Sequence, residues 1–263
     1  MRLRGKIVCI TDADSASGKT LIRRLADEGA DFIVNSASAG VSIDEELAYC
    51  RVAGAQALVF SADLCRFTEV DGMLEEAERQ LGRVDVLVHN HNLIVPMQVE
   101  SCDEAAFVQV MNTNAKSAFL CTQAAGKRMA AAGSGSIVYV SSVHAHKPTG
   151  SSFAYSVSKS AVNMLAREAA LELGRCGVNV NTIELGPVEG DDTLFSSEVS
   201  SLYESYIYKV PGAKPVTYRD LADCVAYLAA DSSRYLNGAE LRLDGGFLLH
   251  YMDHKMKRPE AGQ

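Results

Sequence analysis

A tyrosine, a lysine and a serine near the middle of the chain have the types and spacing needed for proton transfer. Tyr155 and Lys159 are four residues apart in a segment of helical period, so both side chains can address one ligand. A phenol of ordinary pKa near 10 is a weak acid at neutral pH, but an adjacent ammonium favours the phenolate. Ser142 ends an apolar run 13 residues before Tyr155, where its hydroxyl can hold a substrate oxygen.

The spacing S-x12-Y-x-x-x-K after the run IVYVSS resembles the active site of the classical short-chain dehydrogenase/reductase family, and the similarity covers nearly the whole chain. The resemblance implies that Tyr155 exchanges a proton with a carbonyl or hydroxyl oxygen while a nicotinamide moves hydride. It also implies that Ser142 orients that oxygen and that Lys159 holds the nicotinamide ribose. Asn114, in NTNAKSAFLCTQA, falls where the family keeps an asparagine that holds a water in a proton relay to the lysine. A lone Y-x-x-x-K pair also occurs on ordinary surface helices, and the four residues together favour catalysis.

The loop after the first apolar run departs from the family's T-G-x-x-x-G-x-G pattern. It reads ITDADSASGKT, so Gly18 keeps the third glycine while Asp12 and Ala16 replace the first two. Those glycines permit a tight turn and close backbone approach to a pyrophosphate. Asp12 and Asp14 also bring carboxylates near a site meant for a dianion. The glycine motif is therefore atypical.

The other cofactor positions are partly kept. The family's N-N-A-G motif reads H-N-H-N at residues 89–92, and an acid that would select NAD at the end of the second strand is replaced by Ser36. Ser36, with Asn35, Ser38 and Lys19 nearby, can receive a 2′-phosphate, although the family's usual arginine is missing. This pattern favours NADP(H) over NAD(H) and leaves open that no dinucleotide binds. The resemblance assigns to the cofactor Thr11, Gly18, Ser36, Asp63, Asn90, Lys159, Gly186 and Val188.

Histidines and aromatic residues supply candidates for the substrate pocket. His144 and His146 follow Ser142, and Tyr203 lies in the long segment 188–215 between expected elements. Segments of this kind are typically lids or binding loops, although solvated loop positions and simple packing also explain these residues. Four of the six histidines follow strand-like runs, but they lack an H-x-x-x-H spacing and an obvious carboxylate partner. We expect no metal site.

The elements that must position these residues alternate between strand and helix. Runs rich in valine and isoleucine predict strands at 6–11, 31–35, 56–62, 84–89, 136–141, 179–184 and 240–243. Helical patterns fill the gaps at 18–28, 43–53, 69–81, 103–132, 154–175 and 220–230. The fold class predicted is α/β, a single doubly wound Rossmann-like domain with a mostly parallel, seven-stranded sheet and helices on both faces. We expect this domain over residues 1–250, with a substrate lid at 188–215 and a C-terminal tail at 251–263.

The composition limits the partners. A formal net charge of −8 would repel a phosphate backbone, so nucleic acid is not an expected partner, and no apolar run approaches membrane-spanning length. Seven cysteines without C-x-x-C spacing favour a reducing compartment. We therefore expect a cytoplasmic protein that acts on a small molecule. The alanine-rich helical segments at 103–132 and after Tyr155, where the family builds its subunit interface, predict a homotetramer or homodimer.

Three functions fit these residues. The first is an oxidoreductase that interconverts a ketone and a secondary alcohol with NADP(H), using Tyr155 as general acid/base. The second is an atypical family member that has lost normal dinucleotide binding and performs redox-neutral proton transfer, such as isomerisation, elimination or cyclisation. The third is a non-catalytic binding protein. The four catalytic residues argue against the third function, whereas Asp12, Ala16, His89 and Asn92 favour the second over a standard enzyme.

Overall fold

The apolar runs form the seven strands of one sheet in which every neighbouring pair is parallel. The computed structural model describes residues 1–189, 210–212 and 214–249. The strand order is β3-β2-β1-β4-β5-β6-β7. The chain adds β2 and β3 on one side of β1 and then β4 to β7 on the other side, which is the doubly wound topology expected from the sequence. The strands are β1 Ile7–Ile10, β2 Asp31–Asn35, β3 Ala57–Phe60, β4 Val86–His89, β5 Gly135–Ser142, β6 Val178–Leu185 and β7 Glu240–Leu243.

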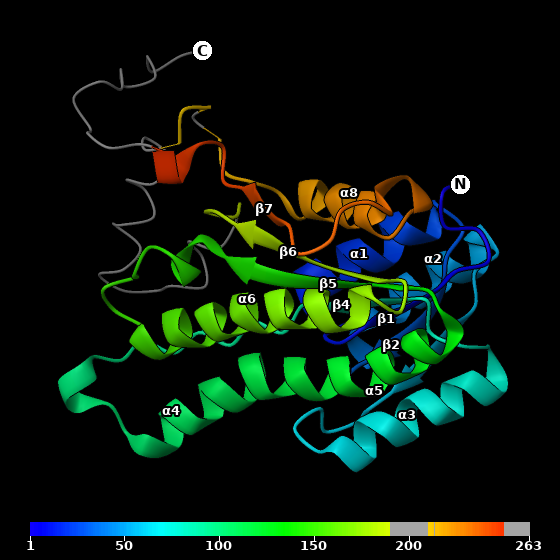
Figure 1. Ribbon diagram of the computed structural model, residues 1–263, viewed down its shortest axis with the longest axis horizontal. Helices are drawn as coiled ribbons and strands as arrows, with labels where there is room; N and C mark the ends of the chain where they lie inside the picture. Colours follow the sequence, from blue (N-terminus) through cyan, green and yellow to red (C-terminus); the bar gives the residue numbers. More distant parts are fainter. Residues whose placement is uncertain (190–209, 213, 250–263) are drawn as a thin grey trace.

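Helices cover both faces of the sheet, as predicted (Figure 1). Successive side chains of a strand point to opposite faces, so Val8 and Ile10 enter one hydrophobic cluster while Ile7 and Cys9 enter the other. The first cluster lies under α1 Ala16–Ala26, α2 Asp44–Ala53 and α8 Tyr218–Leu228, and the second under α3 Phe67–Gln80, α5 Ser117–Ala132 and α6 Phe153–Gly174.

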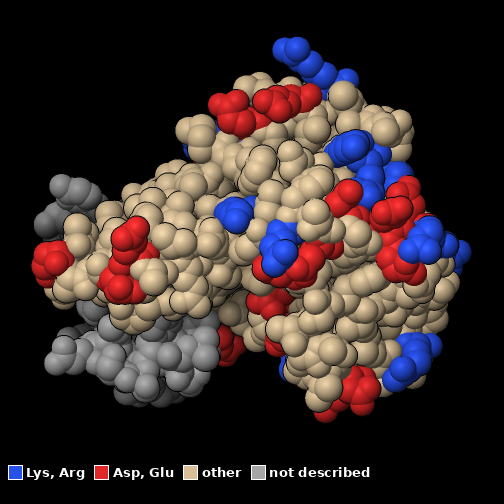
Figure 2. Space-filling view, turned by 90° about the horizontal axis from the view of Figure 1, so that it is seen from below, with Lys and Arg blue, Asp and Glu red and all other residues tan. Residues whose placement is uncertain are grey.

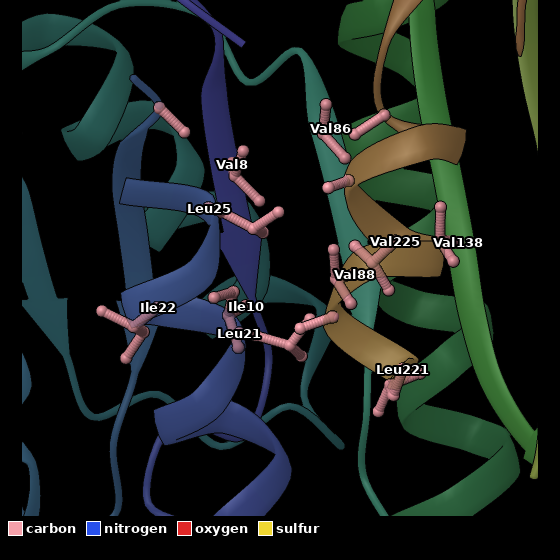
Figure 3. Close-up of a cluster of buried hydrophobic side chains, with 14 of the residues drawn as sticks. Val8, Ile10, Leu21, Ile22, Leu25, Val86, Val88, Val138, Leu221 and Val225 are labelled. Carbon is pink, nitrogen blue, oxygen red and sulfur yellow. The ribbon is translucent and has the colours of Figure 1, made fainter. Parts of the chain in front are cut away.

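Helix α1 is fixed on the sheet by an apolar stripe and by a capped N-terminus. Leu21, Ile22 and Leu25 are fully buried; Leu21 and Leu25 lie against β1, Ile22 points away from it, and α8 packs beside α1 over β4 and β5 (Figure 3). The Oγ of Ser15 accepts the amide of Gly18, which satisfies one of the first free donors of the helix. The loop between β1 and α1 is thereby held in one position.

The expected helix over 103–132 is interrupted. Helix α4 covers Glu104–Met111, a π-helical turn covers Asn112–Lys116, and α5 then begins at Ser117. Turns of this kind insert an extra residue and are common at functional sites. Here the turn contains Asn114, which is fully buried.

The ends of the parallel strands bring the candidate residues to one edge of the sheet. Thr11, Ser36 and Asn90 directly follow β1, β2 and β4, Ser142 is the last residue of β5, and Gly186 follows β6. Ligands of doubly wound folds bind at this edge. Most of the expected lid at 188–215, including Tyr203, and the tail at 251–263 lie outside the described residues.

Candidate active site

Tyr155 and Lys159 lie one turn apart near the start of α6, and both side chains are buried. The Nζ of Lys159 donates to the carbonyl oxygens of His91 at 3.0 Å and Val140 at 3.1 Å, and lies 5.7 Å from the centre of the Tyr155 ring. The lysine therefore ties α6 to the ends of β4 and β5 and places its nitrogen beside the phenol. The sequence predicted this pairing from the four-residue spacing.

Burial lowers the pKa of Lys159 from its ordinary value to about 7. The carbonyls of His91 and Val140 that accept its hydrogen bonds are neutral, so they do little to offset the hydration that a buried ammonium loses. The amine therefore gains and loses its proton near neutral pH, which is the range a proton relay requires.

Ser142 ends β5, and His144 follows it and contacts the Tyr155 ring. The Oγ of Ser142 accepts the amide of His144 at 3.2 Å, and the His144 ring meets the Tyr155 ring edge-on at 6.4 Å. Burial lowers the pKa of His144, although a contact with the Lys147 carbonyl opposes the change. A neutral imidazole thus lies beside the phenol ring, and the role of His144 in a substrate pocket stays a prediction.

Asn92 contacts the phenol itself. The Tyr155 hydroxyl donates to the Oδ1 of Asn92 at 2.9 Å, so an amide oxygen accepts the proton that a substrate oxygen would receive. Sequence reasoning noted Asn92 only as a departure from the N-N-A-G motif and missed this contact. The departure itself was the available signal, because a glycine at this position has no side chain to reach the phenol.

Asn114 positions the segment that carries Asn92. Its Oδ1 accepts the amide of Leu93, and its Nδ2 donates to the Leu93 carbonyl and to the hydroxyl of Ser158 on α6. Both amide hydrogens are used within the protein, and the relay water that the resemblance implies at Asn114 stays a prediction. The side chain joins the π-helical turn, the end of β4 and α6.

The β1–α1 loop is held by Asn90 rather than by glycines. Asn90 accepts the amide of Asp12 at 2.9 Å and donates to the Asp12 carbonyl at 2.7 Å, and its own amide donates to Thr11. Among the described residues other than glycine, only Ala39 has a positive φ, so Asp12 and Ala16 adopt ordinary backbone conformations. The replaced glycines therefore leave no backbone strain in this loop.

Gly18 is the one glycine of the motif that this loop keeps, and the folded loop leaves no room for a side chain there. A Cβ at this position would lie 2.1 Å from the carbonyl oxygen of Asp12. The glycine thus allows α1 to approach the end of β1 closely, which is the role of the third glycine in such motifs.

The start of α1 can hold a pyrophosphate. Ser15 accepts the amides of Gly18 and Lys19, and the contacts described for Ala16 and Ser17 include no acceptor for their amides. Free amides at a helix N-terminus bind phosphate oxygens. These amides fit the pyrophosphate of a dinucleotide, and the ribose contact that the resemblance assigns to Lys159 stays a prediction.

The remaining cofactor positions differ in what they offer. Asp63 is exposed and uses Oδ1 to accept the Cys65 amide. Gly186 lies against Asp244, where a Cβ would approach the Asp244 Cα to 2.7 Å, and Val188 bridges to Val216. The hydroxyl of Ser36, which the sequence assigned to a 2′-phosphate, instead lies 2.7 Å from a carboxylate oxygen of Asp14.

His146 has the carboxylate partner that sequence reasoning did not find. Its Nε2 lies 2.6 Å from Oε1 of the buried Glu184 and 3.7 Å from Glu240. Arg242 and Arg167 pair with these two carboxylates. His146, Glu184 and Glu240 lie close enough together to ligate a cation, but Arg242 and Arg167 neutralise the two carboxylates. The His146 imidazole contacts Glu184 rather than the phenol.

Comparison with known proteins identifies the family. Residues 13–248 match the family described as enoyl-(acyl carrier protein) reductase, and the chain belongs to that family of short-chain dehydrogenases/reductases. An uncharacterised oxidoreductase of Methylorubrum extorquens is 30% identical over 246 residues, which are 93% of this chain and 98% of that protein. A 3-oxoacyl-(acyl-carrier-protein) reductase of Staphylococcus aureus is 29% identical over 249 residues, with 93% and 98% coverage.

Solved structures agree with this assignment. The structure of levodione reductase superposes with a TM-score of 0.89 at 26% identity and covers 95% of this chain and 100% of that one. The predicted family and fold are confirmed, and the chain is an enzyme of the oxidoreductase type. No helix in the described part of the chain is both long enough and apolar enough to cross a bilayer.

Proposed function

We propose that this enzyme interconverts a ketone and a secondary alcohol with a nicotinamide dinucleotide, and that Tyr155 is its general acid/base. The observation that carries the proposal is the buried pair of Tyr155 and Lys159 at the carboxyl edge of the sheet, with the amine beside the phenol. Such a pair suits a reaction in which an oxygen gains or loses a proton. The names of the relatives, a 3-oxoacyl reductase and levodione reductase, support a carbonyl substrate.

Each residue has a distinct task in this reaction. The bound dinucleotide supplies or accepts the hydride at the substrate carbon. Tyr155 gives its hydroxyl proton to the carbonyl oxygen during reduction and takes it back during oxidation. Ser142 holds the same oxygen by a hydrogen bond, and the Lys159 ammonium favours the phenolate that remains after proton transfer. Asn92 must release the phenol before the substrate oxygen can take its place.

The dinucleotide preference expected from the sequence depends on Ser36. A 2′-phosphate would have to bind hydroxyls that already contact the Asp14 carboxylate, so the basis for preferring NADP(H) is weaker in the folded chain. The proposal therefore covers both NAD(H) and NADP(H).

The alternative is redox-neutral proton transfer by the same Tyr155 and Lys159. It is favoured by the bond between Tyr155 and Asn92, because an amide side chain occupies space beside the phenol, and by the carboxylate of Asp12 in the phosphate loop. In this reading the phenol acts on a substrate that brings its own leaving group or double bond.

Titration with NADH and NADPH, followed by nicotinamide fluorescence, separates the two functions. Micromolar binding is expected for the oxidoreductase, and a Tyr155→Phe variant should then reduce a panel of 3-oxo thioesters and cyclic diketones about 10²–10⁴-fold more slowly. Tyr235→Phe, at a side chain that is almost fully exposed, is the matched control and should keep full activity. Absence of binding up to millimolar concentration would direct the assignment to redox-neutral chemistry, and unchanged turnover in Tyr155→Phe would contradict both.

We also infer a cytoplasmic homo-oligomer, a tetramer or a dimer. All seven cysteines are unpaired, which suits a reducing compartment. Val157, Met164 and Leu171 repeat every seven residues along α6 and are exposed, as is Phe119 on α5. The side of the molecule that carries α3, α4 and α5 shows wide areas without charged side chains (Figure 2). Apolar helix faces of this kind are typically covered by another subunit.

A further inference from the structure

The carboxylate of Asp14, in the β1–α1 loop, lies among three serines that follow β2. Its Oδ1 is 2.7 Å from the hydroxyl of Ser36, 3.0 Å from that of Ser38 and 2.6 Å from that of Ser42, while its Oδ2 accepts the amide of Ser38 at 2.9 Å. We call Ser36, Ser38 and Ser42 the serine cradle. Four short contacts to one side chain on a loop indicate a built anion site.

Backbone amides turn the cradle hydroxyls toward the carboxylate. The amide of Gly40 donates to the Oγ of Ser36, and the amide of Ser42 donates to the Oγ of Ser38. An oxygen that accepts an amide leaves its own hydrogen to be donated, and Asp14 lies within reach of that hydrogen. Burial raises the pKa of Asp14, but the bonds from Ser42, Ser36 and Ser38 outweigh it and hold the pKa below its ordinary value, so Asp14 is charged at neutral pH.

The turn that carries the cradle is strained. Ala39 has a φ of 52°, the only positive value among the described residues other than glycine, and Gly40 follows with a φ of 91°. A left-handed alanine is unfavourable and persists where surrounding contacts hold it. The bonds of Ser36 and Ser38 to Asp14 and to the turn supply those contacts.

The cradle lies where a dinucleotide places its adenosine ribose. In doubly wound folds that ribose lies at the end of the second strand, where an acid accepts its hydroxyls in NAD-binding proteins. Ser36 directly follows β2 here and is not an acid. Asp14 brings a carboxylate to the same place from the neighbouring loop.

We propose that Asp14 determines which dinucleotide binds: its carboxylate fills the serine cradle, accepts a hydroxyl of the unmodified adenosine ribose and repels a 2′-phosphate, so NAD(H) binds in preference to NADP(H). This inference rests on the proposed dinucleotide dependence, and it reverses the preference expected from the sequence. Each carboxylate oxygen has about two acceptor positions; the serine hydroxyls crowd Oδ1, whereas Oδ2 accepts only the Ser38 amide and so keeps one position for a ribose hydroxyl.

The repulsion is strong because the two anions would compete for one set of donors. A 2′-phosphate needs the hydroxyls that Asp14 already holds, and its charge would lie a few ångströms from the carboxylate, where unit charges near a protein surface interact strongly. We therefore expect the dissociation constant for NADPH to exceed that for NADH by about tenfold or more, which equals about 1.4 kcal/mol.

The test is calorimetric titration of the intact chain with NADH and NADPH, which needs no substrate. Asp14→Asn keeps the shape and removes the charge, and should tighten NADPH about tenfold while leaving NADH within about threefold. Asp12→Asn is the matched control: it removes a charge from the same loop, outside the cradle, and should tighten both dinucleotides alike. Thermal unfolding of each variant checks that the loop still folds.

The possible results distinguish a failure of the proposed Asp14 specificity from a failure of the proposed dinucleotide-dependent function. Binding of neither dinucleotide by the wild-type chain would overturn the proposed function and the inference with it. Tight binding of NADPH by the wild-type chain, or the same NADPH to NADH ratio in Asp14→Asn as in the wild type, would overturn the inference alone. A ratio that shifts in Asp14→Asn but not in Asp12→Asn supports it.

Discussion

The amine of Lys159 lies between two backbone carbonyls at the end of two strands, and this position makes its proton labile. Because burial lowers its pKa to about 7, the folded chain releases the proton near neutrality, whereas an unfolded chain keeps it to about pH 10.4. Between those values the unfolded state binds more protons, so the free energy of unfolding rises with pH. Below pH 7 both states are protonated, and the folded state carries the full penalty of the buried charge.

This difference predicts the pH dependence of stability. Relative to a Lys159→Met variant, the wild-type chain should gain about 2 kcal/mol of unfolding free energy between pH 7.5 and 9.5, because the slope approaches about 1.4 kcal/mol per pH unit. Urea unfolding of both chains without cofactor, at several pH values, measures it. In the variant, the carbonyls of His91 and Val140 lose their donor, which changes the unfolding free energy by an amount that does not depend on pH. Comparing the slopes of unfolding free energy against pH removes that constant. Parallel curves for the two chains would show that Lys159 keeps its proton throughout.

At the scale of residues, the sequence predicted the neighbours that regular spacing along one helix or strand brings together. Tyr155 and Lys159 are neighbours because a helix places residues four apart together, and Ser142 belongs to the strand that ends beside them. Asn92 was seen only as a departure from a motif, and Asp14 only as a carboxylate near the phosphate site. Their partners come from other strands and loops, 63 residues away for Asn92 and 22 to 28 residues away for Asp14, so the contacts depend on how separate segments meet.

At the scale of elements, the alternation of buried runs and helical segments specified the sheet, because parallel strands covered on both faces are mostly apolar. The ends of the elements shifted by a residue or two, and the π-helical turn at Asn112–Lys116 was missed. An unbroken helical pattern over 103–132 does not show that interruption. It is held by contacts of Asn114 with Leu93 and Ser158, on two other segments.

Two glycines in helices predict opposite effects of one substitution. Gly18→Ala should lower the free energy of unfolding by about 1–3 kcal/mol, because the new methyl would meet the Asp12 carbonyl and force α1 away from β1. Gly72→Ala, on α3, meets nothing within 4 Å and should raise it by about 0.5–1 kcal/mol, since alanine restricts the unfolded chain. Urea unfolding measures both. Equal effects at the two positions would mean that the loop moves aside freely.

At the scale of the whole molecule, the exposed apolar side chains of α6 predict an assembly through α5 and α6. Val157, Met164 and Leu171 share one face of the helix, and Met164 and Leu171 are 51% and 71% exposed. Burying such side chains against another subunit contributes about 1.5–3 kcal/mol each. A charge at the centre of the face would have to be buried without a partner.

Met164→Lys should therefore raise the dissociation constant of the oligomer about 100-fold, which equals about 2.8 kcal/mol. Val52→Lys is the matched control, because Val52 is 89% exposed on α2, which covers the opposite face of the sheet. Sedimentation velocity over a range of concentrations should show the wild-type and Val52→Lys chains as one large species and Met164→Lys shifting toward a single chain. A wild-type chain that sediments alone, or equal behaviour of the two lysine variants, would place the subunit contact away from α6.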